Sequence, residues 1–65
     1  MNTQVAIDML ETGHKVRREN WNDGVYLVKN GGELLMYDPY FKELFAYQLA
    51  GGDIFAKNWE VMWEV

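Results

Sequence analysis

Apolar residues near the start of the chain recur every three or four positions, which is the spacing of one helix face. These residues are Val5, Ala6, Met9 and Leu10. Asn2 or Thr3 can cap the first turn, and Gly13 can end the helix after Thr12. The pattern predicts a helix of about three turns, and its narrow apolar stripe suits packing on a sheet.

Two runs rich in strand-forming residues, 25–29 and 33–37, occupy the middle of the chain. The segment between them, Asn30-Gly31-Gly32, supplies the positive φ angles of a tight hairpin. Before the hairpin, 15–18 is expected to be extended, and 20–24 is expected to be a loop that carries Trp21. Pro39 ends the second hairpin strand because proline lacks a backbone N–H.

The last third of the chain predicts two more strands. Residues 44–49 favour a third strand, although 42–50 could form a helix on propensity alone. Asp53 can cap a single turn through residues 54–56. From Asn58 onward polar residues alternate with Trp59, Val61, Trp63 and Val65, which predicts a closing strand with one apolar face. We therefore expect one α+β domain over residues 1–65, with an N-terminal helix packed on a small antiparallel sheet of four to five strands.

The length and the apolar content of the chain favour self-association. A chain of 65 residues hides only roughly 60% of its surface on folding, so its stability margin is thin. Because the sequence has no cysteine and one histidine, neither disulfides nor a zinc site can supply additional stability. No metal or cofactor is expected. With 49% hydrophobic residues, we expect a homo-oligomer, either a dimer or a tetramer.

The net charge of −4 argues against nucleic acid as a partner, because phosphate neutralisation needs a concentrated basic surface. No apolar run approaches the roughly 20 residues of a membrane span, and no leader sequence is visible, so we expect a cytoplasmic protein with no membrane partner. A small anion is still compatible with the sequence, because Lys15, Arg17 and Arg18 lie close together. The sequence also lacks the motifs of nucleophilic, phosphate-cradling or zinc enzymes, so no catalytic residues and no enzymatic activity are expected.

Three tryptophans offer either packing or ligand stacking. Trp21 lies on a predicted loop, where an indole is less easily used in the core, so stacking on a flat ligand is favoured. Trp59 is balanced between the core and a pocket rim, whereas Trp63 is expected to pack in the core or between subunits.

The polar residues near these tryptophans could likewise either bind a ligand or have only a structural role. Arg18 could contact an anion or form an ordinary surface ion pair with Glu19 or with a carboxylate across a strand. Asn22 could hydrogen-bond a ligand edge or only shape its turn. Among the tyrosines, Tyr40 beside the Pro39 turn is the strongest candidate for a ligand rim.

The order of two segments, 13–22 and 53–59, resembles a known family. The matching positions are Lys15, Val16, Arg18, Trp21, Asn22, Asp53, Ala56 and Trp59. Over nearly its whole length the chain is similar to the second class of Thoeris anti-defence proteins, small phage proteins that sequester the cyclic ADP-ribose signals of a bacterial immune system. It departs from that pattern at Asn58, where the family more often has aspartate, and at residues 45–48, which replace a Trp-x-Pro-type stretch.

The resemblance implies a sponge that binds a cyclic ADP-ribose-type or related cyclic nucleotide signal in pockets between subunits, without cleaving it. In the infected host cell, the partner would then be this small molecule. The implied ligand-binding residues are Arg18, Trp21, Asn22, Tyr40, Asn58 and Trp59. Trp21 or Trp59 would stack a base, Arg18 with help from Lys15 would contact phosphate, and the asparagines would bind polar edges.

Two other functions remain compatible with the sequence. An acidic chain with exposed aromatic residues could inhibit a host defence protein by direct binding. It could also be a structural or packaging component that has no ligand.

Overall fold

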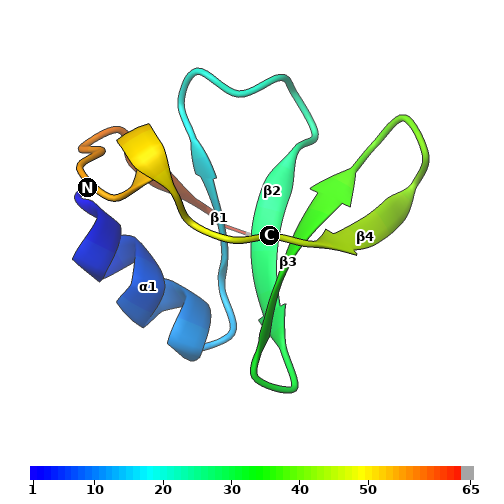
Figure 1. Cartoon of the computed structure of the whole chain (residues 1–65), viewed down its shortest axis with the longest axis horizontal. Coiled ribbons are helices and arrows are strands. Elements are labelled where there is room, and N and C mark those ends of the chain that lie inside the picture. The colour runs from blue at the N-terminus through cyan, green and yellow to red at the C-terminus, as the bar shows by residue number, and fades with distance from the viewer. Residues whose placement is uncertain (64–65) are drawn as a thin grey trace.

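The computed structural model describes residues 1–63, which form one helix packed against one face of a five-stranded sheet (Figure 1). The elements in chain order are α1 (Thr3–Glu11), β1 (Lys15–Arg18), β2 (Tyr26–Asn30), β3 (Glu33–Asp38), β4 (Glu43–Ala46), the short 3₁₀ turn η1 (Gly51–Asp53) and β5 (Trp59–Met62). The α+β class and the antiparallel sheet predicted from the sequence are confirmed.

The strands lie in the order β4-β3-β2-β1-β5, and every neighbouring pair is antiparallel. The closing strand β5 therefore returns to the start of the chain, where Trp59 pairs with Arg18 and Val61 pairs with Val16. This pairing brings the two sequence segments that carry the resemblance, 13–22 and 53–59, next to each other in space.

The helix begins where a capping side chain is available. The Asn2 side chain accepts a hydrogen bond from the Val5 backbone N–H at 2.9 Å, so Asn2 is the cap and Thr3 is the first helical residue. Gly13, with φ of 91°, follows the end of the helix, as the sequence predicts.

The hairpin between β2 and β3 also forms where it is predicted. Asn30 pairs with Glu33, and the two residues between them, Gly31 and Gly32, have φ values of 60° and 84°. A two-residue loop with positive φ at both positions matches the right-handed twist of the flanking strands.

Two expectations for the second half of the chain are wrong in detail. The helix considered for 42–50 does not form, because β4 pairs with β3, and the predicted strand 44–49 is instead Glu43–Ala46. The single turn predicted after Asp53 forms, with the Ala56 N–H donating to the Asp53 carbonyl at 3.3 Å, but the Asp53 side chain does not cap it and accepts instead from the Ala50 N–H at 3.5 Å. Glu64 and Val65 lie outside the described residues, so their predicted place in the closing strand is not addressed.

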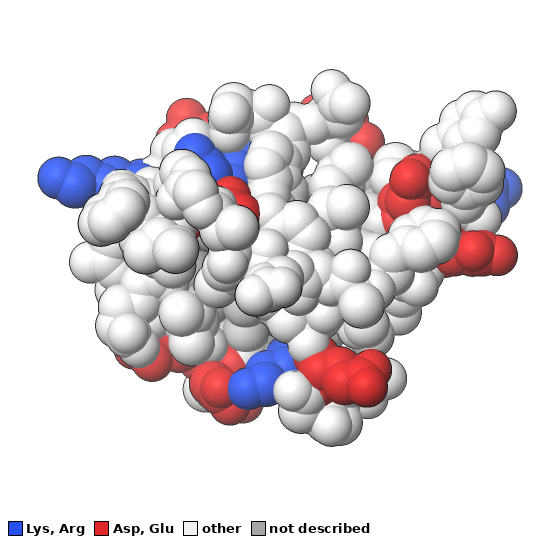
Figure 2. Space-filling model, in the orientation of Figure 1, with Lys and Arg blue, Asp and Glu red and all other residues white. Residues whose placement is uncertain are grey.

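The core lies between α1 and the β1, β2 and β5 side of the sheet. Its buried members are Ala6, Leu10, Val16, Leu27, Ala56 and Trp59. The chain leaving β4 crosses the same face of the sheet to reach η1 beside the start of the helix (Figure 1). On this side of the molecule the charged side chains lie largely around the periphery (Figure 2).

The helix does not lie on the opposite face of the sheet, which is apolar over β2, β3 and β4 but carries the charged Lys15, Arg17 and Glu60 at β1 and β5. The strand registers place Tyr26, Val28, Leu35, Tyr37, Leu44, Ala46 and Met62 on that face. Tyr26 and Tyr37 stack there with ring centroids 5.0 Å apart. Trp63, expected to pack, is 69% exposed in the single chain. One copy of the chain therefore leaves a large apolar area uncovered.

Candidate functional site

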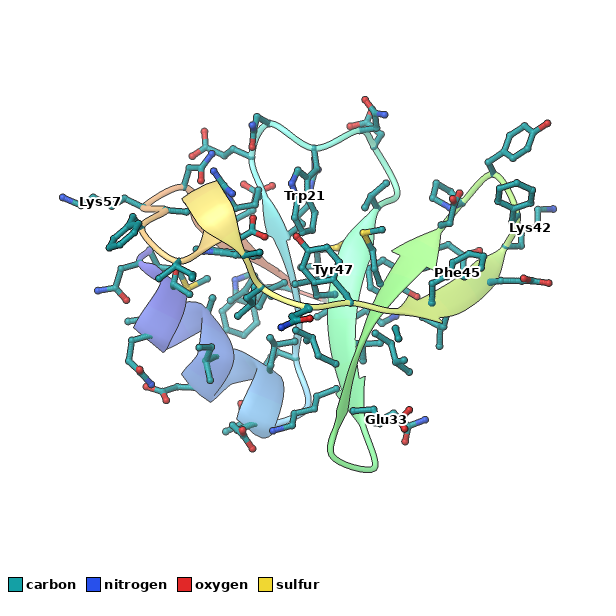
Figure 3. The ribbon with its side chains drawn as sticks, viewed as in Figure 1. Trp21, Glu33, Lys42, Phe45, Tyr47 and Lys57 are labelled. Carbon is teal, nitrogen blue, oxygen red and sulfur yellow. The ribbon has the colours of Figure 1, made fainter. Side chains whose placement is uncertain are left out.

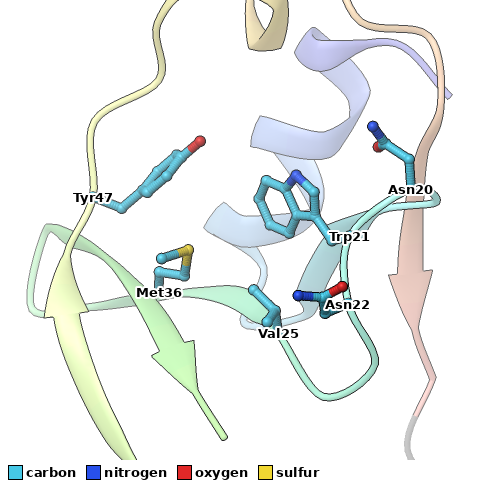
Figure 4. Close-up of a pocket in the computed structure, with 6 residues that line it drawn as sticks. All are labelled: Asn20, Trp21, Asn22, Val25, Met36 and Tyr47. Atoms are coloured by element: carbon cyan, nitrogen blue, oxygen red, sulfur yellow. The ribbon is translucent and has the colours of Figure 1, made fainter. Parts of the chain in front are cut away.

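A pocket of about 330 Å³ lies between the loop before β2 and the chain leaving β4 (Figure 4). It is lined by Asn20, Trp21, Asn22, Val25, Met36 and Tyr47. This volume is at the lower end of the roughly 300 to 1,000 Å³ that enclose a small organic ligand. A pocket of this volume can accept one flat ring system.

Two aromatic side chains form the walls of this pocket. The Trp21 indole and the Tyr47 ring lie next to one another there (Figures 3 and 4) and meet edge to face, with centroids 6.0 Å apart and planes at 67°. Behind Trp21, the Trp59 indole makes a second edge-to-face contact at 5.6 Å and 77°. Such contacts hold the half-buried Trp21 in one orientation.

The loop that carries Trp21 is fixed by its own backbone groups. The Trp21 N–H donates to the Arg18 carbonyl at 3.0 Å, and the Arg17 guanidinium donates to the Trp21 carbonyl. The Asn22 carbonyl accepts from the Val25 N–H at 3.2 Å, which closes the turn into β2. Asn22 thus shapes its turn through the backbone while its side-chain amide remains at the exposed rim of the pocket.

The carboxylate of Asp53 binds two side chains next to the pocket. It accepts from Arg18 Nη1 at 2.7 Å and from the Tyr47 hydroxyl at 2.5 Å. Arg18 Nε donates to Asn58 Oδ1 at 2.5 Å, and the guanidinium lies 5.6 Å from the centre of the Trp59 ring. Arg18 therefore forms an ion pair, but its partner is Asp53 of η1 rather than Glu19 or a carboxylate across a strand, and the pair is largely buried. The same carboxylate holds the Tyr47 hydroxyl.

The Tyr47 hydroxyl remains protonated well beyond neutral pH. Burial, the hydrogen bond to Asp53 and the charge of that carboxylate raise the pKa of Tyr47 from 10.0 to about 12, against a smaller opposing effect of Arg18. Tyr47 is therefore a neutral donor at physiological pH.

Trp59 belongs to the core, where it supports the pocket from behind. Its side chain is 3% exposed, and its Nε1–H donates to the Thr3 hydroxyl at 2.9 Å. That hydroxyl in turn donates to the Asp53 carbonyl at 2.5 Å. The chain of contacts ties the start of α1 to both Trp59 and Asp53.

The sequence-predicted residues fall into three positions around this pocket. Trp21 and Asn22 line it. Asn58 reaches it indirectly, because its amide donates to Asn20 Oδ1 at 3.2 Å. Arg18 and Trp59 do not line it, although the Trp59 ring contacts Trp21. Tyr40 is 84% exposed and does not line it, so its predicted role as a ligand contact would need another molecule to bring it there.

Four lining residues were not predicted, namely Asn20, Val25, Met36 and Tyr47. Asn20 could have been suspected from its position next to Trp21. Met36 and Tyr47 come from β3 and from the chain after β4, and no local pattern marks them.

All six side chains that line the pocket are uncharged. Among residues 1–63, no cluster of three or more histidine or acidic side chains is placed to hold a metal ion. Within the same residues, no helix has the length and apolarity to cross a membrane. The geometry therefore fits a flat, neutral ring with polar edges, such as a nucleobase.

The chain was compared with protein families and with curated proteins. The sequence model of the Tad2-like family, described as the Thoeris anti-defense 2-like domain, matches residues 1–62. No curated protein matches the chain. Because the match covers nearly the whole chain, including every residue of the pocket, the protein belongs to the Thoeris anti-defense 2-like family.

Proposed function

We propose that the protein is an anti-defence sponge that binds a cyclic ADP-ribose-type or related cyclic nucleotide signal and holds it without cleavage. Family membership supports the anti-defence role. The observation that carries the proposal is the pocket lined by Trp21 and Tyr47, whose rings meet edge to face, with amide side chains at its rim.

In this proposal the pocket receives a base. A base that stacks on Trp21 contributes about 1–3 kcal/mol, as base–aromatic stacking does in single-strand binding proteins. The amides of Asn20 and Asn22 offer both donors and acceptors to its edges. Specificity would come from these edges, because a site built to hydrogen-bond polar groups rejects ligands that leave them unpaired.

The phosphates of the ligand would lie outside this pocket. The sequence assigned phosphate contact to Arg18 and Lys15, but Arg18 already donates to Asp53 and Asn58. The Lys15 ammonium lies 4.8 Å from the centre of the Tyr26 ring, on the sheet face opposite the helix. Cations that meet the phosphates would therefore come in part from another subunit, which agrees with the proposed homo-oligomer. The uncovered apolar sheet face supports the same assembly.

Binding without chemistry is consistent with the lining of the pocket. None of the six lining side chains is a carboxylate, an imidazole, a hydroxyl of serine or threonine, or an amine. The Tyr47 phenol, with a pKa of about 12, is a poor base at neutral pH. Sequestration depends on slow release rather than turnover, and a preorganised wall favours it.

Isothermal calorimetry with a panel of cyclic nucleotides and cyclic ADP-ribose isomers tests the proposal. We expect one panel member to bind the native protein, and Trp21→Ala to weaken that binding about 5- to 150-fold, which corresponds to the 1–3 kcal/mol of stacking. Phe55→Ala is the matched control, because Phe55 is 84% exposed and does not line the pocket. No heat from any panel member, together with a stoichiometric host protein recovered in a pull-down, would instead support the protein-binding inhibitor.

A further inference from the structure

Asn58 is held in place by the loop that precedes β2. Its backbone carbonyl accepts from the Glu19 N–H at 2.9 Å, and its side-chain Oδ1 accepts from Arg18 Nε at 2.5 Å. The guanidinium is fixed in turn, because its Nη1 donates to Asp53 at 2.7 Å and its side chain is only 16% exposed. The Asn58 side chain therefore has one position relative to this loop.

Arg18 decides which end of the Asn58 amide faces it. A guanidinium has hydrogen-bond donors and no acceptor, so the Asn58 atom that contacts Nε has to be the oxygen. The NH₂ group of Asn58 is left to face Asn20, and it donates to Asn20 Oδ1 at 3.2 Å. The direction of both hydrogen bonds thus follows from the chemistry of Arg18.

Asn20 extends this direction to the pocket. Its exposed side chain is one of the six that line the pocket (Figure 4). Because its oxygen accepts from Asn58, the end of its amide that remains for a ligand is the NH₂ group, which carries donors only. Hydrogen bonds in such a chain polarise one another, and this strengthens the donors at its end.

We propose that Asn58 is a positioning residue that presents the N–H groups of Asn20 to the ligand, so that the pocket selects a base edge that carries hydrogen-bond acceptors. N7 and O6 of a 6-oxopurine form such an edge, whereas a 6-aminopurine has a donor beside N7. In a ligand that contains adenine, a ring nitrogen would meet Asn20 and the amino group would be turned away. This selectivity rests on the proposed function, whereas the orientation of the two amides does not.

An aspartate at position 58 would reverse the selection. One carboxylate oxygen would keep the bond to Arg18 Nε, and the other would lie where the native amide nitrogen donates to Asn20. Two acceptor oxygens cannot share a hydrogen bond, so the exposed Asn20 amide would turn over and donate its NH₂ group to the new carboxylate. The Asn20 oxygen would then remain for the ligand, and the pocket would select a base edge that carries donors.

Two cyclic mononucleotides measure this selection by calorimetry. The purine of 3′,5′-cyclic IMP has an oxygen at position 6, and that of 3′,5′-cyclic AMP has an amino group there. Their phosphate charge is the same, so a change in the charge of the protein affects both affinities alike. We expect the native protein to bind cyclic IMP about 5- to 10-fold more tightly than cyclic AMP, which is the lower end of the effect of an unpaired polar group because the rim is exposed.

Asn58→Asp should reverse this preference. Asn30→Asp is the matched control, because it makes the same change in charge at an exposed position that does not line the pocket, and it should keep the native ratio of the two affinities. Asn20→Ala shows whether Asn58 acts through Asn20, since Asn58→Asp should not alter the ratio when Asn20 is absent. Equal weakening of both nucleotides by Asn58→Asp would indicate a merely structural role and would overturn the proposal. A reversal that persists in the Asn20→Ala background would overturn it as well.

Nitrogen-15 NMR of the side-chain amides tests the orientation without a ligand. In the native protein the NH₂ group of Asn58 is hydrogen-bonded, so its protons should exchange with water more slowly than those of Asn20. In Asn58→Asp the exchange of the Asn20 protons should slow. The opposite order in the native protein would overturn the orientation. If neither mononucleotide binds the native protein, the selectivity is overturned and the exchange rates still decide the orientation, whereas the proposed function is decided by the whole calorimetry panel.

Discussion

Replacement of Asp53 by alanine removes the hydrogen-bond acceptor that Arg18 and Tyr47 share next to the pocket. The Asp53 carboxylate is the acceptor for Arg18 Nη1 at 2.7 Å and for the Tyr47 hydroxyl at 2.5 Å. Without it, Arg18 retains its bond to Asn58 but loses its ion pair. Tyr47 loses the acceptor that fixes the orientation of its ring.

The free energy of unfolding should fall by about 2–4 kcal/mol in Asp53→Ala. Removal of one partner from a buried ion pair costs about 3–5 kcal/mol, and the loss of an acceptor for a buried donor costs about 1–3 kcal/mol. The Arg18 and Asp53 side chains are 16% and 12% exposed, so water relieves part of both costs. A chain of 65 residues is expected to have a stability of only about 3–10 kcal/mol. The substitution therefore removes a large part of the total.

Urea denaturation followed by tryptophan fluorescence measures this loss, because the transition midpoint reports the free energy of unfolding. Asp8→Ala is the control, since it makes the same change in net charge at an exposed helix position. We expect the control to remain within about 0.5 kcal/mol of the native protein. If Asp53→Ala unfolds at the same urea concentration as Asp8→Ala, then the Arg18–Asp53–Tyr47 contacts do not stabilise the fold, and this reasoning is refuted.

Two further predictions concern the groups around the pocket. Thr3→Val keeps the side-chain shape but leaves the Trp59 Nε1–H without its acceptor. Urea denaturation should therefore show that the free energy of unfolding falls by about 1–3 kcal/mol. The control Thr12→Val, at an exposed position, should change it little. For Tyr47, the folded pKa of about 12 lies above the ordinary value of 10.0, so its contribution to stability is complete below pH 10 and is lost as the pH rises through 12. Ultraviolet titration of the native protein should show one late tyrosine ionisation that is absent from Tyr47→Phe, and a spectrum in which all tyrosines ionise together would contradict the assignment.

Local signals were sufficient to predict most elements of the fold. The apolar spacing from Val5 to Leu10 predicted α1, and Asn30-Gly31-Gly32 predicted the β2–β3 hairpin because positive φ at both glycines suits few other residues. The third strand was ambiguous, because residues 42–50 suit a helix nearly as well on propensity. Pairing with β3 decided the outcome, and this long-range contact cannot be read from the segment itself.

The site was only partly predictable for the same reason. Trp21 was predicted because an indole on a loop is less easily used in the core, Asn22 was predicted from the family resemblance, and both line the pocket. Tyr47, which also lines the pocket, is on a segment whose path across the sheet depends on where β4 ends and on the bond between Tyr47 and Asp53. Likewise, the partners of Arg18 come from residues 53 and 58, far along the chain, so the sequence left open whether Arg18 contacts an anion or a carboxylate, and the structure pairs it with Asp53.

Recovery of the bound molecule after release tests the central claim most directly. The native protein in molar excess is mixed with the cyclic nucleotide or cyclic ADP-ribose isomer that calorimetry identifies, and the free ligand is measured by mass spectrometry before and after heat denaturation of the protein. The account predicts that the free ligand falls by nearly one equivalent per site and returns with its mass and chromatographic position unchanged. A ligand that is never depleted, or one that returns chemically altered, would contradict it.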